Sequence, residues 1–487
     1  MLPARGYTEH RYIVDSASCQ MNLVVMTRSD LLASPNTGAV VLLHGLSANG
    51  EIMDYLARAF ANQGLTVFVP DLPGHGRSPG PFSPDRAESC SASLLRGLAA
   101  RGMIIPERTI LAGHSMGADI ALRVADKLRP AGVIAISPAP MIPAHGVTSQ
   151  DLLYHTLPLL VPNTLVMAGQ FEPAGLAANA ADLATKSPYP SWVKFSRIPW
   201  NTHVSMLVSP TVAREAQEWA AQTLHLPNAA QVPSRANFVA CVLGIIGVLL
   251  IAGPFVREMV GKEPPVEIEA ATNGTVHWLR GAVELVLVSA VTLVLLGHWI
   301  PLRILHLFEG DYLASFFLLV GMGLVLLHLK PARDGLRTPG GLLVGAIVAA
   351  LLLHLLVTGW IALTSTGTWL IWQRWARFPL FLLATFLFLY GLEIIVGPIV
   401  PAGKASTRFA FWCLLIVLSW LALTAGLFYL RSGEILPVLL SPYFALVLLL
   451  SGLGIQLVRR VSGSSPAAAI FGAILLAGFC LVLFPLS

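Results

Sequence analysis

Two patterns of apolar and polar residues divide this chain. Up to about residue 228, short runs typical of buried strands alternate with amphipathic stretches, whereas from Asn237 onward long apolar stretches follow one another. Amphipathic stretches lie between the candidate strands from the third strand onward, which predicts a mostly parallel sheet with helices on both faces. The candidate strands cover residues 11–14, 21–26, 39–43, 66–69, 109–112, 132–136, 164–167 and 192–195.

The second half predicts a domain that crosses a membrane several times. Eight stretches approach the length of apolar chain that a spanning helix needs, and their only acids are Glu284 and Glu393. Soluble core helices almost never run so long without charge, so we expect an all-α polytopic domain of about eight transmembrane helices. The stretches cover residues 237–256, 281–300, 312–329, 341–363, 378–400, 409–430, 436–457 and 467–485.

A short linker is predicted between the two halves. Residues 226–235 contain two prolines and several small residues, and they show no hydrophobic periodicity. The predicted organisation is therefore a first domain at residues 1–228, a linker at 229–236 and a transmembrane helical domain at 237–487.

Composition and charge agree with a membrane protein. The 487 residues are 55% hydrophobic and only 12% charged, and the mean hydropathy of +0.70 is too high for a soluble protein. A net charge of +5 would suit nucleic-acid binding. However, the Lys and Arg residues lie largely in loops between the apolar stretches, so membrane topology explains the excess and we expect no nucleic-acid partner.

The five cysteines carry little information. Cys241, Cys413 and Cys480 lie inside predicted spans, while Cys19 and Cys90 stand alone, without the paired spacing of a zinc site or a redox motif. We therefore expect all five to serve in packing.

The most informative motif is the run Leu-Ala-Gly-His-Ser-Met-Gly at residues 111–117. Its G-x-S-x-G core lies between a buried-strand pattern at 109–112 and a helical pattern at 118–128. A serine on a sharp turn from strand to helix is the exposed nucleophile of many hydrolases, so Ser115 is the candidate nucleophile.

Acyl transfer through a serine also needs a base and an acid that orients the base. His203 follows the last strand and is the candidate base. Glu172 follows the strand at 164–167 and is the candidate acid, so the residues occur in the order Ser, acid, His. Asp182 is the alternative acid, although it lies within a predicted helix. Asp151 precedes the strand and is poorly placed.

These residues reveal a family resemblance. The chain resembles the α/β-hydrolase superfamily across residues 10–224. Five places carry the resemblance: residues 41–46 (VLLHGL), 71–78 (DLPGHGRS), 113–117 (GHSMG), 169–172 (GQFE) and His203. The stretch GHGRSPG most resembles the monoacylglycerol-lipase-like and related esterase branches. The expected fold is therefore an α/β hydrolase with a short cap, followed by the transmembrane helices.

The resemblance also implies roles for other residues. The backbone N–H groups of Leu46 and Met116 would form the oxyanion hole. His44 would shape the oxyanion loop, and Asp71 and His75 would shape a turn. This chain departs from the family at the acid position, where aspartate is commoner than Glu172.

The predicted cap is short and apolar. Only some 25 residues separate the strand that ends at Ile136 from the strand that starts at Thr164, and they are rich in proline and large apolar side chains. We expect the membrane domain or lipid to cover the site and substrates to arrive from lipid. The candidate substrate contacts in the cap are Met141, Leu152, Leu153 and Tyr154.

Two ionisable residues lie deepest within the predicted spans. Ionisable groups inside a membrane are functional candidates, so Glu393 and His354 are assigned either to a transport or lipid pathway or to structural hydrogen bonds. The histidines lack the spacing of a metal site. We expect neither a metal nor a cofactor.

The sequence thus predicts a membrane-embedded serine hydrolase acting on lipid or other acyl esters. Acyl transfer to a lipid or envelope acceptor is a second reading. A third is a transporter or membrane-complex subunit whose hydrolase-like domain is a binding module. The oligomeric state stays open.

The facing of the first domain also stays open. Loops opposite that domain carry ten Lys and Arg residues and loops on its own side carry four, which favours an extracytoplasmic domain. Residues 1–10 show no apolar signal region, which favours the cytoplasm.

Overall fold

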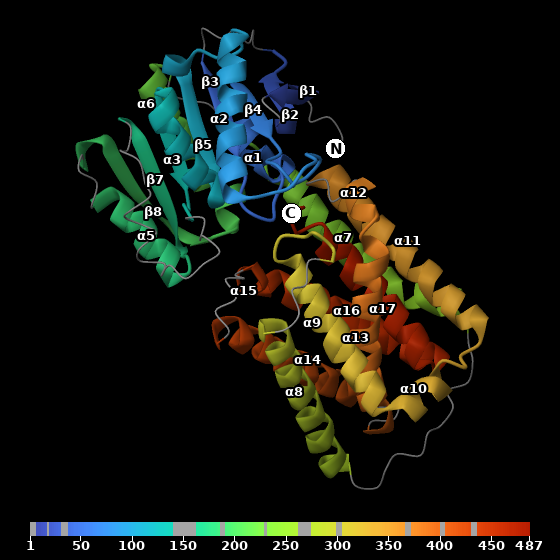
Figure 1. The fold of residues 1–487 in the computed structure, drawn as a ribbon. Coiled ribbons are helices and arrows are strands. Elements are labelled where there is room, and N and C mark those ends of the chain that lie inside the picture. Colours follow the sequence, from blue (N-terminus) through green and yellow to red (C-terminus); the bar gives the residue numbers. More distant parts are fainter. Residues whose placement is uncertain are drawn as a thin grey trace. The chain divides into compact units, whose positions relative to one another are not determined.

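The computed structural model separates into two compact units. One consists mainly of Met1–Cys241 and the other mainly of Val242–Trp360 and Trp369–Phe484 (Figure 1). The residues described are 6–16, 19–30, 38–139, 162–185, 190–227, 231–261, 274–298, 304–365, 372–399, 405–429 and 436–487.

The first unit is built on an eight-stranded sheet with the strand order β1-β2-β4-β3-β5-β6-β7-β8. β2 pairs antiparallel with both β1 and β4, and the other neighbouring strands are parallel. All eight predicted strands are present, so the prediction of a mostly parallel sheet is confirmed. The strands are β1 (Tyr7–Ser16), β2 (Cys19–Arg28), β3 (Ala39–Leu43), β4 (Thr66–Pro70), β5 (Thr109–His114), β6 (Gly132–Ile136), β7 (Thr164–Phe171) and β8 (Val193–Thr202).

Helices cover both faces of this sheet, as the continuous apolar runs of its central strands require. Ile110 and Ala112 of β5 share a core with α1 and α6. Gly113, the next residue along, points to the other face, where a Cβ atom would collide with Gly117 of α3. The helices are α1 (Asp54–Ala61), α2 (Pro84–Ala100), α3 (Met116–Leu128), α5 (Ala174–Thr185) and α6 (Pro210–Leu224), with short 3-10 turns η1 (Gly50–Met53), η2 (Pro106–Arg108), η3 (Pro190–Trp192) and η4 (Ser205–Val208).

Serine followed by proline begins two of these helices. Ser83 Oγ accepts a hydrogen bond from the Arg86 N–H at the start of α2, and Ser209 Oγ accepts one from the Val212 N–H at the start of α6. Proline at the first helical position lacks an N–H that would have no partner there. The local sequence therefore sets where each helix begins.

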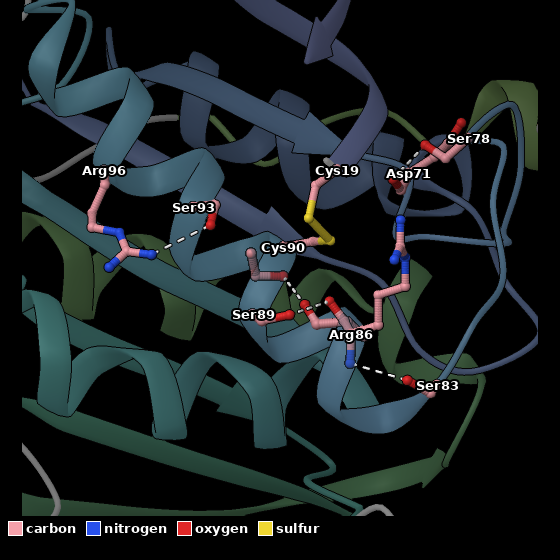
Figure 2. The surroundings of a disulfide bond; sticks show 11 residues. Cys19, Asp71, Ser78, Ser83, Arg86, Ser89, Cys90, Ser93 and Arg96 are labelled. Atoms are coloured by element: carbon pink, nitrogen blue, oxygen red, sulfur yellow. Dashed lines mark hydrogen bonds between the residues drawn. A yellow bond between two sulfur atoms is a disulfide. The ribbon is translucent and has the colours of Figure 1, made fainter. Parts of the chain in front are cut away.

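A disulfide joins β2 to α2. Cys19 and Cys90 are bonded across 71 residues of chain (Figure 2). The expectation that these two cysteines only pack was wrong, because the pairing depends on how α2 lies against the sheet and not on any spacing along the chain. Cys241, Cys413 and Cys480 are free thiols.

The second unit is a bundle of apolar helices. Among the described residues, seven helices are long and apolar enough to cross a membrane, which fits a multi-pass integral membrane protein. The eighth predicted span is the 17-residue helix α17, about 26 Å long. The helices are α7 (Ala236–Val260), α8 (Gly274–His298), α9 (Gly310–Leu327), α10 (Leu329–Gly335), α11 (Gly340–Thr364), α12 (Trp372–Trp375), α13 (Phe378–Ile399), α14 (Ala405–Tyr429), α15 (Leu436–Leu439), α16 (Ser441–Ser462) and α17 (Ser465–Leu481).

Helices α9 and α17 pack against α13, α16 packs against α17, and most of α17 is buried. Glycine allows the closest approach. A Cβ atom on Gly321 of α9 would collide with the backbone of Leu387 in α13. Lipid supplies no hydrophobic force between helices, so such close contact provides much of the attraction that holds a bundle together.

Candidate active site

Ser115 lies on the turn between β5 and α3 in a strained backbone conformation, with φ at 56° and ψ at −122°. The flanking glycines make this turn sterically possible. A Cβ atom on Gly113 would collide with the carbonyl oxygen of Gly117, and one on Gly117 would collide with that of Leu43 in β3. The glycines of the motif therefore allow the helix to approach the sheet, and strain of this kind is typical of functional sites.

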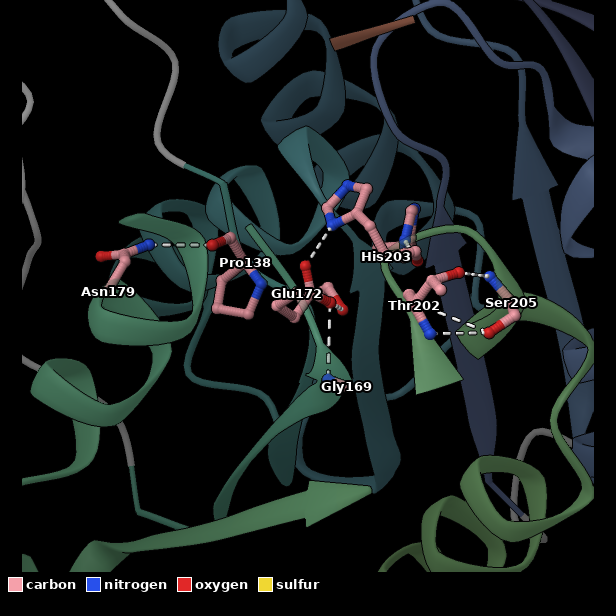
Figure 3. Close-up of polar contacts among 9 residues, drawn as sticks. Pro138, Gly169, Glu172, Asn179, Thr202, His203 and Ser205 are labelled. Carbon is pink, nitrogen blue, oxygen red and sulfur yellow. Dashed lines mark hydrogen bonds and ion pairs between the residues drawn. The ribbon is translucent and has the colours of Figure 1, made fainter. Parts of the chain in front are cut away.

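Glu172 and His203 form a hydrogen-bonded pair. Glu172 follows the last residue of β7 and His203 follows the last residue of β8. The Nδ1 atom of His203 lies 2.9 Å from Oε2 of Glu172 (Figure 3). The Glu172 side chain is fully buried and the His203 side chain is 13% exposed. The carboxylate therefore fixes the imidazole ring while one edge of the ring stays near the surface.

Both oxygens of Glu172 have partners. Oε1 accepts a hydrogen bond from the Ser137 hydroxyl and lies 3.4 Å from the Gly169 N–H. Burial by itself would raise the pKa of Glu172, but the hydrogen bonds and charge of His203, with Ser137 and Gly169, outweigh it and hold the pKa below its ordinary value. The pair thus keeps a carboxylate that is ionised although it is buried.

The contact between His114 and His203 was not predicted from the sequence. The Nε2–H of His114 donates to the carbonyl oxygen of His203 at 2.9 Å, and the two rings lie 4.7 Å apart. Burial, together with the nearby charge of His203, lowers the pKa of His114 to about 3, so the ring is neutral at physiological pH. The position of His114 directly before Ser115 in the motif could have marked it as a residue of the site.

Ser115, Glu172 and His203 lie at one edge of the sheet. β3, β5, β7 and β8 run parallel, so their carboxyl ends share an edge, which is where open α/β sheets bind ligands. Ser115 ends β5, and a Cβ atom on Gly45, in the loop after β3, would lie 3.1 Å from the Ser115 Cβ. His203 joins this group because its ring packs on that of His114.

The two N–H groups assigned to the oxyanion hole belong to this cluster. Leu46 follows Gly45 in the loop after β3, and Met116 is the first residue of α3. Neither N–H makes a backbone hydrogen bond to another of the described residues outside the regular helix and strand pattern.

His44 supports the loop after β3 and has no contact that would use it as a proton carrier. Its Nε2 accepts the Leu72 N–H at 2.9 Å, so Nδ1 carries the proton and donates to the Gly45 carbonyl at 2.8 Å. Burial, only partly offset by the charge of Asp71, lowers the pKa of His44. The ring of His75 lies 5.1 Å away. These contacts agree with the loop-shaping roles expected of both histidines.

Asp71 holds three segments together. Oδ1 accepts the Gly50 N–H at 2.7 Å, and Oδ2 accepts the Asn22 side-chain amide and the Arg77 N–H at 2.9 Å each. The carboxylate is fully occupied by the turn it shapes, as expected.

Residues 34–233 match the family model described as serine aminopeptidase, S33. The N-terminal domain has the α/β-hydrolase fold. Esterase YjfP of Escherichia coli (strain K12) is 27% identical to this hydrolase domain over 149 residues, which cover 27% of this chain and 55% of the esterase. The chain thus spans about half the length of that curated relative.

Solved structures also resemble the hydrolase domain. An α/β serine hydrolase without a lid from Xanthomonas campestris is 19% identical with a TM-score of 0.36, and the match covers 45% of this chain and 96% of that one. Est1E from Butyrivibrio proteoclasticus, with ferulic acid bound, is 14% identical with a TM-score of 0.37, and the match covers 44% of this chain and 99% of that one.

The cap residues Met141, Leu152, Leu153 and Tyr154 lie outside the described residues, so their contact with substrate stays a prediction.

The two intramembrane candidates are separate from the hydrolase site. Glu393 is fully buried in α13, and Arg408 Nη2 donates to it at 2.5 Å. His354 in α11 packs edge-on against Phe479 of α17, with ring centres 4.8 Å apart. Within the described ranges, no group of three His, Cys, Asp or Glu side chains is arranged to hold a metal ion.

Proposed function

We propose that this protein is a membrane-embedded serine hydrolase that cleaves carboxylic esters derived from lipids. Ser115 is the nucleophile, His203 the general base and then acid, and Glu172 the residue that orients His203. The observation that carries the proposal is the buried Glu172–His203 pair, whose imidazole packs against the residue next to the strained Ser115 turn.

The chemistry follows from the hydrogen bonds. Glu172 holds the His203 Nδ1–H, which leaves Nε2 free to accept the hydroxyl proton of Ser115. Ser115 Oγ then bonds to the ester carbonyl carbon, and the N–H groups of Leu46 and Met116 stabilise the oxyanion. The proton on Nε2 passes to the leaving alcohol. Water repeats the sequence to release the carboxylic acid and restore Ser115.

The lipid origin of the substrate is supported by the second half of the chain. Seven long apolar helices are far more than an anchor requires, and the segment between β6 and β7 is apolar and rich in proline. An enzyme held at a bilayer meets acyl esters that water-soluble esterases meet only after extraction.

We also place the hydrolase domain outside the cytoplasm. The Cys19–Cys90 disulfide supports this facing because disulfides persist in oxidising compartments. The sequence-based count agrees, because it assigns ten Lys and Arg residues to the ends of the predicted spans opposite the domain and four to the ends on its own side. Cleavage of the domain by protease added to intact cells is expected, and cleavage only after membrane disruption would contradict this facing.

The first experiment measures acid release by the full-length protein purified in detergent. The panel contains monoglycerides, lysophospholipids, diacyl lipids and acyl thioesters, plus aminoacyl anilides because the matching family model is described as an aminopeptidase. We expect Ser115→Ala to lower the rate by a factor on the order of 10⁴ or more. Ser89→Ala, an exposed serine on α2, is the matched control with an unchanged rate.

The alternatives predict different outcomes. Acylation of Ser115 without release of acid, followed by transfer to an added acceptor, would establish an acyltransferase. Cleavage of anilides in preference to esters would establish a peptidase. Full biological function of the Ser115→Ala protein would contradict every enzymatic reading and favour a binding module.

A further inference from the structure

The helical unit contains a cavity of about 420 Å³ that is separate from the hydrolase site. It lies among α10, the last turns of α13 and α16, and the first turn of α17. Its polar lining includes Arg337, Thr338, Glu393, Arg459, Ser464 and Ser465.

Glu393 and Arg459 line the cavity, and together with Arg408, which pairs with Glu393, they form a buried cluster with more positive than negative charge. Glu393 accepts a hydrogen bond from Arg408 Nη2 at 2.5 Å, which uses Oε2, and Oε1 has no partner among the described residues. Arg459 is 7% exposed and donates through Nη1 to the Gly463 carbonyl, while its Nε has no described partner. Glu393 therefore pairs with Arg408, and Arg459 has no ion-pair partner among the described residues.

A buried charge without a counterion costs several kcal/mol. Asp334, the other acid of the lining, does not relieve this cost, because it pairs with Arg337 at 3.9 Å and both side chains are largely exposed. The hydroxyl of Tyr390 donates to the Ala332 carbonyl at 2.7 Å and is also used. An anionic ligand that enters the cavity would therefore neutralise the excess positive charge at Arg459.

The N-terminus of α17 adds to the positive electrostatic potential in the cavity. Ser464 caps this 17-residue helix by accepting the Ala467 N–H at 3.2 Å, and Ser465 and Pro466 line the cavity. The N-terminus of a helix carries a partial positive charge and binds anions such as phosphate. Thr338 Oγ1 lies 2.9 Å from Ser464 Oγ, so hydroxyl groups border the same space.

We propose that this cavity binds the phosphate group of an anionic ligand. Arg459 and the first turn of α17 contact the phosphate oxygens, since a guanidinium group and a helix N-terminus both match phosphate geometry. The cavity volume leaves room for an organic group attached to the phosphate. The ligand is either the headgroup of a phospholipid or a soluble phosphate ester, and both offer the same phosphate chemistry.

The proposed phosphate site lies at the cytoplasmic side of the bundle. α9, α13 and α16 all end at the face of the bundle whose loops carry more Lys and Arg, which the positive-inside rule assigns to the cytoplasm. The inference requires no reaction at Ser115, so the Ser115→Ala protein is expected to bind phosphate ligands unchanged.

The experiment measures how ligands shift the thermal unfolding of the full-length protein in detergent. A ligand that binds only the folded protein raises the midpoint, and at equal concentration a tighter ligand raises it more. The probes are inorganic phosphate, glycerol 3-phosphate and short-chain phosphatidylglycerol, with glycerol and short-chain diacylglycerol as controls without phosphate. Stabilisation by phosphatidylglycerol alone identifies a lipid headgroup, and equal stabilisation by glycerol 3-phosphate identifies a soluble ester.

Adjacent arginines provide the matched variants. Arg459→Gln is expected to weaken phosphate-ligand affinity roughly tenfold or more, because it removes charge-assisted hydrogen bonds. Arg460→Gln removes the same charge from an exposed neighbour and is expected to change little. Glu393→Gln is expected to tighten binding, because it removes the competing carboxylate. Arg459→Lys keeps the charge and is expected to retain part of the affinity.

Three results would overturn the proposal. The first is that no phosphate-bearing probe shifts the midpoint more than its phosphate-free control. The second is that Arg459→Gln and Arg460→Gln lose affinity equally. The third applies if Arg459→Gln does not fold: unchanged affinity in both Glu393→Gln and Arg459→Lys would then contradict a site built on this charge cluster.

Discussion

Each unit of the molecule buries a glutamate side chain completely, but the two carboxylates have different surroundings. Glu172 in the hydrolase domain has hydrogen-bond partners for both oxygens, supplied by His203, Ser137 and the Gly169 N–H. Glu393 in the helical unit has Arg408 at one oxygen and no described partner at the other. The hydrogen-bond network of Glu172 is complete, whereas that of Glu393 leaves one oxygen without a described partner.

This difference indicates what each site does. A fully satisfied network holds its members in one geometry before substrate arrives, which is the requirement for acid-base chemistry. The charge cluster beside the cavity gains free energy when an anionic ligand supplies the partner that Arg459 Nε lacks among the described residues. This contrast supports the reaction that we propose for the first site and the phosphate binding that we propose for the second.

The largest expected effect comes from Glu172→Gln, which tests the closed network. An amide cannot stabilise the imidazolium form of His203, so ester hydrolysis is expected to fall by a factor on the order of 10⁴. Glu218→Gln, an exposed glutamate on α6, is the matched control. Steady-state hydrolysis rates would measure both, and a loss below tenfold in Glu172→Gln would remove Glu172 from the mechanism.

The two units also differ in covalent bonding, because the Cys19–Cys90 disulfide lies within the hydrolase domain. Cys90→Ala releases a loop of 71 residues and is expected to destabilise the hydrolase domain by about 4 kcal/mol. Cys413→Ala in α14 replaces a free thiol and is the control. Thermal unfolding with and without reductant measures the effect. Reductant should lower the midpoint of the parent protein, and an unchanged midpoint would show that the bond does not brace the domain.

The smallest effect concerns pH and His114. The pKa of His114 is about 3 in the folded domain and near 6.5 when unfolded, so the unfolded chain binds the proton first. Its stabilising contribution is complete above pH 6.5 and is lost as the pH falls toward 3. At about pH 5.5 the loss is about 1.4 kcal/mol.

His114→Gln removes this titration, and midpoints of the hydrolase domain at about pH 8 and about pH 5.5 would measure it. The variant should show a smaller drop in midpoint than the parent protein across this range. Equal drops in the two proteins would show that His114 does not titrate in this way.

Much of the fold could be predicted because its signals are local. β3 is buried on both faces and is therefore a continuous apolar run of strand length. The spanning helices must satisfy their own backbone groups in lipid and therefore show long apolar stretches. Gly113 and Gly117 flank Ser115 because no larger residue fits where α3 approaches the sheet.

The contacts of the candidate sites could not be predicted in the same way. Glu172 and His203 are 31 residues apart, and the sequence shows only that each follows a strand. Arg408 and Arg459 were counted as loop charges from the sequence, yet both are buried in α14 and α16. The cavity that Arg459 lines is formed by residues from α10, α13, α16 and α17, which lie far apart along much of the chain.

The sequence by itself determined the elements, the strained serine turn and the division into a hydrolase domain and a membrane-spanning bundle. These follow from periodicity and from steric limits that act over a few residues. Only the tertiary structure decided that Cys19 bonds Cys90, that His114 packs on His203, and that Glu393 pairs with Arg408. The physical reason is that such pairings depend on how the sheet and helices pack, and packing joins residues whose separation in sequence carries no signal.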